Sequence, residues 1–260
     1  MTERVGIVVP TIGTRPGYLP LALQSIRQAG GNAYILLVGN QTFDASDLQQ
    51  QGLIDEYLVE PQPGLAAKIN FGLRSLPEDI KFFNWLGDDD LLEPGSLDLC
   101  LERITQPDQP VLVFGGCRYI NELGAQIWQM PTTRWAPQLL RFGPQLMPQP
   151  GSLYSRAAFE TVGGLDESLG WAFDFKLFLK LSQLGKCAFL DSTLCSFRWH
   201  GGSLSVARRR ESVLEASLVR RQNLPAALRP LSQLWEFPVR EATYWAGVRL
   251  SKKISKTRNS

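Results

Sequence analysis

Three adjacent aspartates form the strongest chemical feature of the sequence. Asp88, Asp89 and Asp90 follow the apolar segment 81–86 after a single glycine and precede two leucines and a Pro-Gly pair. Burying three like charges together is costly unless a cation accompanies them. Mg²⁺ and Mn²⁺ prefer one or two protein carboxylates together with diphosphate oxygens. The triplet therefore indicates a site for Mn²⁺ or Mg²⁺ and a diphosphate, whereas an acidic triplet without this context is typical of a solvated turn.

Three further side chains could do chemistry, and each has an ordinary structural interpretation beside the chemical one. Asp174 opens the amphipathic segment 172–184, where a carboxylate can simply complement the helix dipole. Lys68 belongs to the helical segment 64–76, where a lysine can lie on a solvated helix face. His200 is the single histidine, and a lone histidine is more often an ordinary surface or core residue than a ligand.

The elements around these residues alternate in type over the first hundred residues. Apolar runs of strand length end in polar loops, and apolar residues recur at helical spacing within 18–30 and 64–76. The expected strands of this part are 5–9, 33–39, 54–61 and 81–86. Such alternation predicts an α/β fold with a mostly parallel sheet flanked by helices, which binds ligands at the carboxyl ends of its strands.

The second half is less regular. Residues 124–150 contain five prolines and many glutamines, which predicts strands joined by long loops. The expected strands are 111–120, 151–156 and 187–200, and the expected helices are 157–164 and 172–184. A charged helix is expected at 207–222, and a second helix that follows it is expected to break at Pro238.

Four segments, in order, resemble the family 2 glycosyltransferases, which are inverting enzymes of the GT-A fold. The similar segments are 8–26, 64–73, 86–97 and 155–185. The resemblance covers about residues 5–205, and it implies a Rossmann-like GT-A domain over 1–206 with a helical C-terminal extension over 207–260.

The resemblance also implies roles for individual residues. It assigns nucleotide-sugar binding to Pro10, Thr11, Arg15, Asn40, Asp44, Lys68, Asn70, Asp88 and Asp89. It assigns a divalent metal, Mn²⁺ or Mg²⁺, to Asp89, Asp90 and His200, and the role of acceptor base to Asp174. The chain departs from the family pattern at Gly39, Gly87 and Phe173, where the family commonly has acidic residues.

The implied function is metal-dependent, inverting transfer of a sugar from a nucleoside-diphosphate sugar to a hydroxyl of a glycan or lipid-linked acceptor. The three departures keep a catalytically inactive sugar- or nucleotide-binding protein open as an alternative. A sugar-phosphate nucleotidyltransferase is a second alternative, but such enzymes usually need a basic, glycine-rich loop, and 11–17 has one arginine and no lysine. Trp171 and Trp199 could stack on a sugar ring or belong to the core.

The C-terminal extension is strongly basic. Residues 207–260 carry 12 Lys and Arg against 4 acidic residues, whereas the preceding part is net negative. The aromatic residues Trp235, Phe237, Tyr244 and Trp245 lie among these charges. This mixture predicts a peripheral contact with a membrane surface. A helical flap packed on the catalytic domain, or an oligomer contact, remains an open interpretation.

The bulk composition excludes several classes of protein. The chain has 260 residues, 44% of them hydrophobic, and its apolar runs are far shorter than the ~20 residues of a membrane-spanning helix. No secretory signal is visible, and four scattered cysteines are typical of buried thiols in a reducing compartment. We therefore expect a cytoplasmic enzyme that does not bind nucleic acid. Polysaccharide biosynthesis and glycolipid assembly are equally compatible with it.

Overall fold

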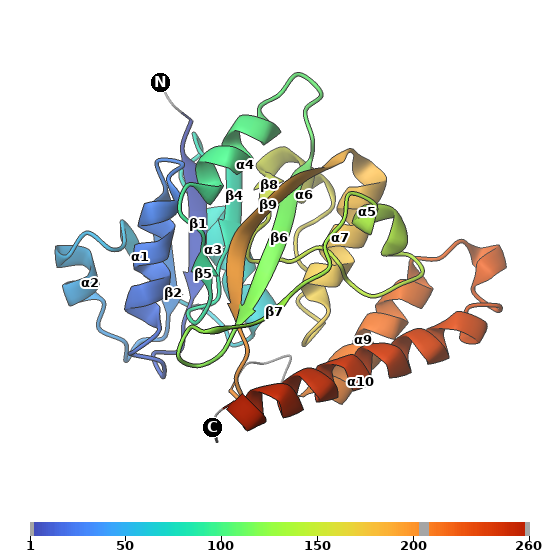
Figure 1. The fold of residues 1–260 in the computed structure, drawn as a ribbon. Helices are drawn as coiled ribbons and strands as arrows, with labels where there is room; N and C mark the ends of the chain where they lie inside the picture. The colour runs from blue at the N-terminus through green and yellow to red at the C-terminus, as the bar shows by residue number, and fades with distance from the viewer. Residues whose placement is uncertain (1–2, 203–207, 258–260) are drawn as a thin grey trace.

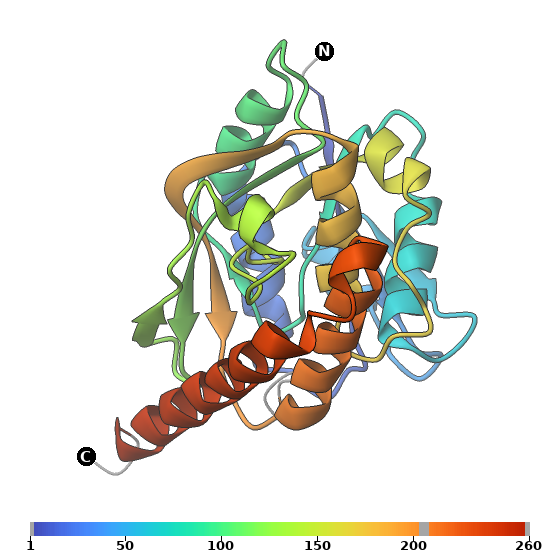
Figure 2. The same ribbon diagram turned by 90° about the vertical axis from the view of Figure 1, so that its right-hand side faces the viewer.

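The fold is a curved β-sheet covered by helices on both faces, with two further helices at the C-terminal end (Figures 1 and 2). The computed structural model describes residues 3–202 and 208–257. Within these residues nine strands form one sheet, in the order β3-β2-β1-β4-β8-β6-β9-β5, with β7 paired to β6. The strands are β1 Val5–Pro10, β2 Tyr34–Gly39, β3 Glu56–Val59, β4 Phe82–Trp85, β5 Leu91–Leu92, β6 Leu112–Ile120, β7 Gln126–Gln129, β8 Leu153–Ser155 and β9 Cys187–Arg198.

The first half of the sheet is parallel. β3, β2, β1 and β4 pair parallel in that order, and β6 pairs parallel with β9. β8 lies antiparallel between β4 and β6 and joins these two parallel groups. The predicted α/β fold with a mostly parallel sheet is confirmed.

Alternating side chains of the central strand enter different cores, as the two-residue period of a strand requires. Val8 of β1 faces a core with α3, α6 and α7, whereas Ile7 and Val9 face a core with α1 and α4. Gly72 of α3 permits one of these close contacts, because a Cβ there would lie 2.6 Å from a methyl group of Val8. These helices are α1 Leu19–Ala29, α3 Leu65–Ser75, α4 Ser96–Ile104, α6 Arg156–Thr161 and α7 Phe173–Leu184.

The remaining helices lie outside this sandwich. They are α2 Ser46–Gln50, α5 Ala136–Leu139, α9 Arg209–Gln222, the 3₁₀ turn Ala226–Leu228 and α10 Gln233–Thr257. α9 packs against α7 and places Val219 in the core, so the extension is a helical pair that lies against the body (Figure 2). The predicted division between residues 206 and 207 lies outside the described residues and stays a prediction.

The predicted helix break at Pro238 is wrong. α10 continues through Pro238, which is the sixth residue of the helix. A proline removes one backbone donor, and the residue whose carbonyl would have accepted that bond, Leu234, is 77% exposed. Water can therefore satisfy the carbonyl, and the helix tolerates the proline.

Candidate active site

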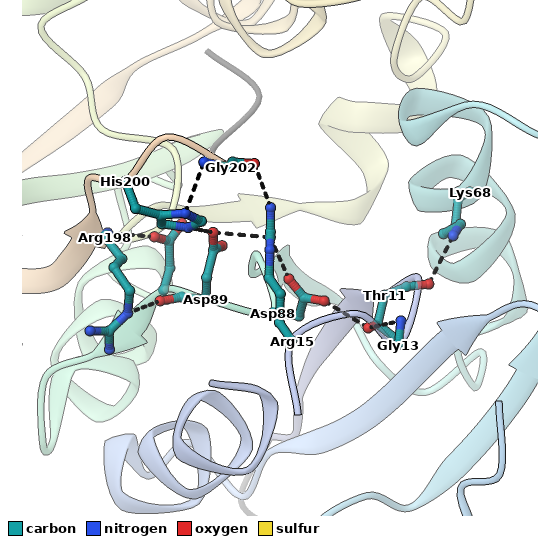
Figure 3. Close-up of polar contacts among 10 residues, drawn as sticks. Thr11, Gly13, Arg15, Lys68, Asp88, Asp89, Arg198, His200 and Gly202 are labelled. Carbon is teal, nitrogen blue, oxygen red and sulfur yellow. Dashed lines mark hydrogen bonds and ion pairs between the residues drawn. The ribbon is translucent and has the colours of Figure 1, made fainter. Parts of the chain in front are cut away.

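The acidic triplet and the loop after β1 meet at the carboxyl edge of the sheet (Figure 3). β1 and β4 are parallel neighbours, so the residues that follow them emerge side by side. Thr11 directly follows β1, and its hydroxyl donates to Asp88 Oδ2 at 2.7 Å. The backbone N–H of Gly13 donates to the same hydroxyl at 3.0 Å. The loop is thus fastened to the first aspartate of the triplet.

Arg15 joins three loops at this point (Figure 3). Its Nη1 atom lies 2.7 Å from Asp88 Oδ1 and 3.0 Å from Asp89 Oδ2. Its Nη2 atom donates to the carbonyl of Gly202 at 2.8 Å. The guanidinium therefore offsets the charge of two aspartates and keeps part of its surface exposed, where an anionic ligand can reach it.

His200 follows β9 and faces the second aspartate. Its Nε2 atom lies 2.7 Å from Asp89 Oδ2, and the N–H of Gly202 donates to its Nδ1 atom at 3.1 Å. Because Nδ1 accepts a hydrogen bond in this arrangement, Nε2 carries the proton that lies between the imidazole and Asp89. Both side chains are about nine-tenths buried.

Asp90 faces the backbone of β9 rather than the imidazole. Its Oδ1 atom accepts a 2.8 Å hydrogen bond from the N–H of Arg198. Burial, and then the neighbouring charge of Asp89, raise the pKa of Asp90 well above its ordinary value. The predicted metal residues therefore divide into a facing pair, Asp89 and His200, and a third carboxylate that supports β9.

This pair suits the metal that the resemblance implies, although the described residues hold no preformed cluster of three His, Cys, Asp or Glu ligands. A carboxylate oxygen and an imidazole nitrogen form an acceptable donor set for Mn²⁺, with diphosphate oxygens and water completing it. Asp89 and His200 would hold such an ion, and the imidazole would have to give up the proton that it shares with Asp89. The donor set therefore fits, with two protein ligands rather than three.

Lys68 and Asn70 of α3 serve two different loops. Lys68 is 4% exposed, and its ammonium donates to the carbonyl of Thr11 at 2.9 Å and pairs with Glu60 at 2.8 Å. Asn70 donates to the carbonyl of Leu165 and to Glu167, 95 and 97 residues away along the chain. Lys68 thus supports the loop after β1, and Asn70 supports the segment that leads to α7.

The loop after β2 holds the other predicted nucleotide residues. Asn40 accepts from the N–H and the hydroxyl of Thr42, and Asp44 accepts from the N–H of Ser46 at the start of α2. Hydrogen bonding to the side chain of Ser46, and then to its backbone N–H, lowers the pKa of Asp44. Pro10, the last residue of β1, pairs in register with Val38 at the end of β2. Both loops therefore open at the same edge of the sheet.

The structure explains one departure from the family pattern. A Cβ atom at Gly39 would lie 2.9 Å from the hydroxyl of Tyr57 on β3. That tyrosine therefore fills the space of the acidic side chain that the family commonly has there. Sequence reasoning missed Tyr57, because only strand pairing brings it beside Gly39.

Asp174 lies in the first turn of α7, as the sequence predicts. Its Oδ1 atom accepts from the N–H of Phe175 at 2.7 Å, and its Oδ2 atom accepts from the amide of Gln145 at 3.0 Å. Burial raises the pKa of Asp174 above its ordinary value. A carboxylate with a raised pKa is suited to take up a proton.

Two tryptophans predicted as sugar contacts have different surroundings. The indole N–H of Trp199 donates to Ser251 of α10 at 3.1 Å, and its ring lies 5.6 Å from the ring of Tyr119. The indole N–H of Trp171 is buried and has no partner among the described residues. Trp199 thus connects the sheet to the extension, and a sugar contact stays a prediction for both.

Sequence comparison identifies glycosyltransferases among similar proteins. A scan against models of protein families finds no match for the chain. The chain is 22% identical over 272 residues to the uncharacterized glycosyltransferase RC0461 of Rickettsia conorii. That alignment spans 98% of this chain and 44% of the relative, so the chain spans less than half the relative's length.

Solved structures share the fold. TarS 1-349 of S. aureus has a TM-score of 0.63 and 15% identity, over 92% of this chain and 71% of that protein. The mannosyltransferase PcManGT of Pyrobaculum calidifontis, solved in complex with GDP-Man and Mn²⁺, has a TM-score of 0.62 and 14% identity, over 100% and 80% respectively. By sequence and by fold, the chain is similar to glycosyltransferase enzymes.

Proposed function

We propose that this glycosyltransferase-like chain is an inverting, metal-dependent enzyme of family 2 with the GT-A fold. It moves a sugar from a nucleoside-diphosphate sugar to an acceptor hydroxyl. The observation that carries the proposal is the gathering of Thr11, Arg15, Asp88 and Asp89 at the carboxyl ends of β1 and β4. Ligands of open α/β sheets bind at such an edge.

The donor binds along this edge. The nucleoside contacts Pro10, Thr11, Asn40 and Asp44. Arg15 donates hydrogen bonds to the diphosphate with N–H groups that otherwise bind the aspartates. Lys68 adds positive charge behind the loop, and Asn70 keeps α3 joined to the acceptor side. Binding of GDP-Man by the similar PcManGT supports this arrangement.

Asp89 and His200 would hold Mn²⁺ or Mg²⁺, with Asp90 supporting β9 beside them. Bound there, the ion would neutralise the charge that develops on the leaving diphosphate. The Mn²⁺ in the PcManGT complex supports the choice of metal.

Asp174 acts as the base. It takes the proton of the acceptor hydroxyl while that oxygen attacks the anomeric carbon from the side opposite the diphosphate. The bond between the anomeric carbon and the diphosphate oxygen breaks, and the configuration of the sugar inverts. The raised pKa of Asp174 supports this role, because it makes the carboxylate a better proton acceptor.

The acceptor is a glycan or glycolipid, and the extension brings the enzyme to the cytoplasmic face of a membrane. α10 carries exposed Leu234, Phe237 and Trp245, followed by exposed Arg249 on the same side of the helix. Apolar and aromatic side chains beside basic ones are typical of interfacial helices. No helix in residues 3–202 and 208–257 is long and apolar enough to cross a bilayer.

Turnover of UDP- and GDP-sugars with Mn²⁺ tests the proposal. We expect one donor to release its nucleoside diphosphate and an inverted sugar, identified by NMR of the anomeric proton. Release of pyrophosphate from a nucleoside triphosphate and a sugar phosphate would support a nucleotidyltransferase instead. Nucleotide binding without turnover of any donor, with water or glycan acceptors, would indicate the inactive binding protein.

A further inference from the structure

The C-terminal extension touches each segment that holds Asp174. α9 lies against α7, and α10 packs against α9 (Figure 2). The contacts reach the residues before Asp174, the residue after it, and the loop that supplies its hydrogen-bond donor.

Glu215 of α9 binds the segment just before Asp174. Its carboxylate accepts from the backbone N–H of Gly170 at 3.0 Å, of Trp171 at 2.7 Å and of Ala172 at 2.6 Å. These three amides immediately precede α7, whose N-terminal end favours negative charge. One side chain therefore fixes both the path of the chain and the start of the helix that carries Asp174.

Two other contacts of the extension reach residues close to Asp174 in the chain or in its hydrogen-bonding loop. The guanidinium carbon of Arg220, one turn beyond Glu215, lies 5.4 Å from the ring centre of Phe175, which follows Asp174. The ring of Trp235 on α10 lies 5.9 Å from the ring of Phe142, in the loop that supplies Gln145. The amide of Gln145 donates to Asp174. The extension thus contacts the residues on both sides of Asp174 and the loop that supplies Gln145.

We propose that Glu215 is a positioning residue for the acceptor base, and that the extension is part of the acceptor half of the active site. The contribution of Glu215 is geometric, because its three hydrogen bonds set the position of the first turn of α7. It is also electrostatic, because its negative charge helps to raise the pKa of Asp174. This inference rests on the proposed role of Asp174.

The charged and titratable groups around Asp174 are few among the described residues. Glu215 faces it from α9, and Tyr154, whose pKa is raised well above its ordinary value by burial and then by Asp174, faces it from β8. The nearby cation Arg220 lies over the ring of Phe175 and is paired with Glu236 at 3.0 Å. Removing the charge of Glu215 should therefore lower the pKa of Asp174.

The experiment compares the full chain with the variants Glu215→Gln and Glu211→Gln. Glu211 lies one turn earlier on α9, is exposed and forms a 3.8 Å pair with Arg208, so it is a matched control for loss of charge. Hydrogen exchange of the amides of residues 170–172 and the pKa of Asp174, from carboxyl ¹³C NMR, are measured first. We expect faster exchange and a lower pKa in Glu215→Gln alone. Equal exchange and equal pKa in all three proteins would overturn the proposal.

The kcat and KM for hydrolysis of UDP- and GDP-sugars are then measured in the presence of Mn²⁺. Hydrolysis uses water as the acceptor, so no acceptor glycan has to be known. We expect Glu215→Gln to lower kcat by about 10- to 100-fold, as for a misplacement of up to 1 Å. The KM for the donor stays unchanged, and the acid limb of the pH profile moves to lower pH. A change in KM alone, or an unmoved acid limb, would contradict the proposal.

These two measurements separate the possible failures. If the wild-type chain binds and hydrolyses no donor, the proposed function fails, and exchange and NMR still decide whether Glu215 positions Asp174. If Glu215→Gln is too unstable to study, Glu215→Asp, which keeps the charge but is shorter, replaces it. We then expect faster exchange at 170–172, and unchanged exchange would overturn the proposal.

Discussion

A side chain at residue 87 would collide with the carboxylates that follow it. A Cβ atom there would lie 2.9 Å from Asp89 Oδ1 and 3.2 Å from Asp90 Oδ2. The glycine therefore leaves the space in which Asp89 can face His200 and Asp90 can accept from β9. At this residue, the departure from the family pattern is a packing requirement of the site.

We expect Gly87→Ala to lower the free energy of unfolding by about 1–3 kcal/mol, because overpacking a buried site forces its neighbours apart. Urea unfolding checks this value. Gly17→Ala is the control, since a Cβ atom at Gly17 would meet nothing within 4 Å and the backbone there needs no glycine conformation. Equal loss of stability in both variants would contradict the steric explanation.

We expect Asp174→Asn to lower the rate of transfer by about 10²–10⁴-fold, as for loss of general-base catalysis, with nucleotide binding retained. The base works in its deprotonated form, so the wild-type rate should fall as the pH drops through the raised pKa of Asp174. The acid limb should therefore lie above the ordinary range of an aspartate. A pH profile of kcat/KM measures it, and a limb at or below that range would argue against Asp174 as the base.

At the scale of elements, one buried ion pair joins α9 to α10. The side chains of Arg220 and Glu236 are 5% and 9% exposed, and their closest atoms are 3.0 Å apart. Arg220 Nε and Glu236 Oε1 are buried without hydrogen-bond partners among the described residues. The pair therefore fixes how the two helices meet, with incomplete hydrogen bonding.

We expect Glu236→Leu to destabilise the protein by about 3 kcal/mol, because a buried guanidinium then loses its partner. The double variant Arg220→Met with Glu236→Leu should lose less than the single variant, since no unpaired charge stays buried. Chemical unfolding of the two single variants and the double variant gives the coupling energy. A double variant no more stable than Glu236→Leu would contradict this explanation, because the unpaired guanidinium would then not be the cause of the loss.

The local elements were largely predictable from the sequence, whereas several contacts of the site were not. The run 5–9 is apolar throughout because its strand is buried on both faces, and this pattern is visible without a structure. Contacts such as Glu215 with Trp171 join residues 44 apart, and no periodicity encodes them. Pro238 misled the prediction because its cost depends on whether water reaches the carbonyl one turn before it.

At the scale of the whole molecule, the carboxylate site and the basic extension have opposite charge. Asp88, Asp89 and Asp90 lie in the net negative part of the chain, whose 15 basic and 21 acidic residues give −6, whereas residues 207–260 have 12 basic and 4 acidic residues, or +8. The sequence predicted this asymmetry. The sequence left open whether the extension packs on the body, and the structure shows that α9 does, with Val219 in the core.

We expect the double variant Phe237→Ser with Trp245→Ser to lose binding to vesicles that contain phosphatidylserine. Both side chains of α10 are exposed and would enter the interface. Leu123→Ser is the control, because Leu123 is 93% exposed in the turn between β6 and β7. Vesicle sedimentation measures binding. Equal binding by all three proteins would argue against the membrane contact and favour another role for this face.

The most direct test of the account is calorimetric titration of the chain with UDP and with GDP, with and without Mn²⁺. We expect one nucleotide to bind only with Mn²⁺. We expect Asp89→Asn to lose this Mn²⁺-dependent binding and the control Asp191→Asn, exposed on β9, to retain it. Metal-independent binding in the wild-type chain, or unchanged Mn²⁺ dependence in Asp89→Asn, would contradict a metal-diphosphate site at Asp89 and His200.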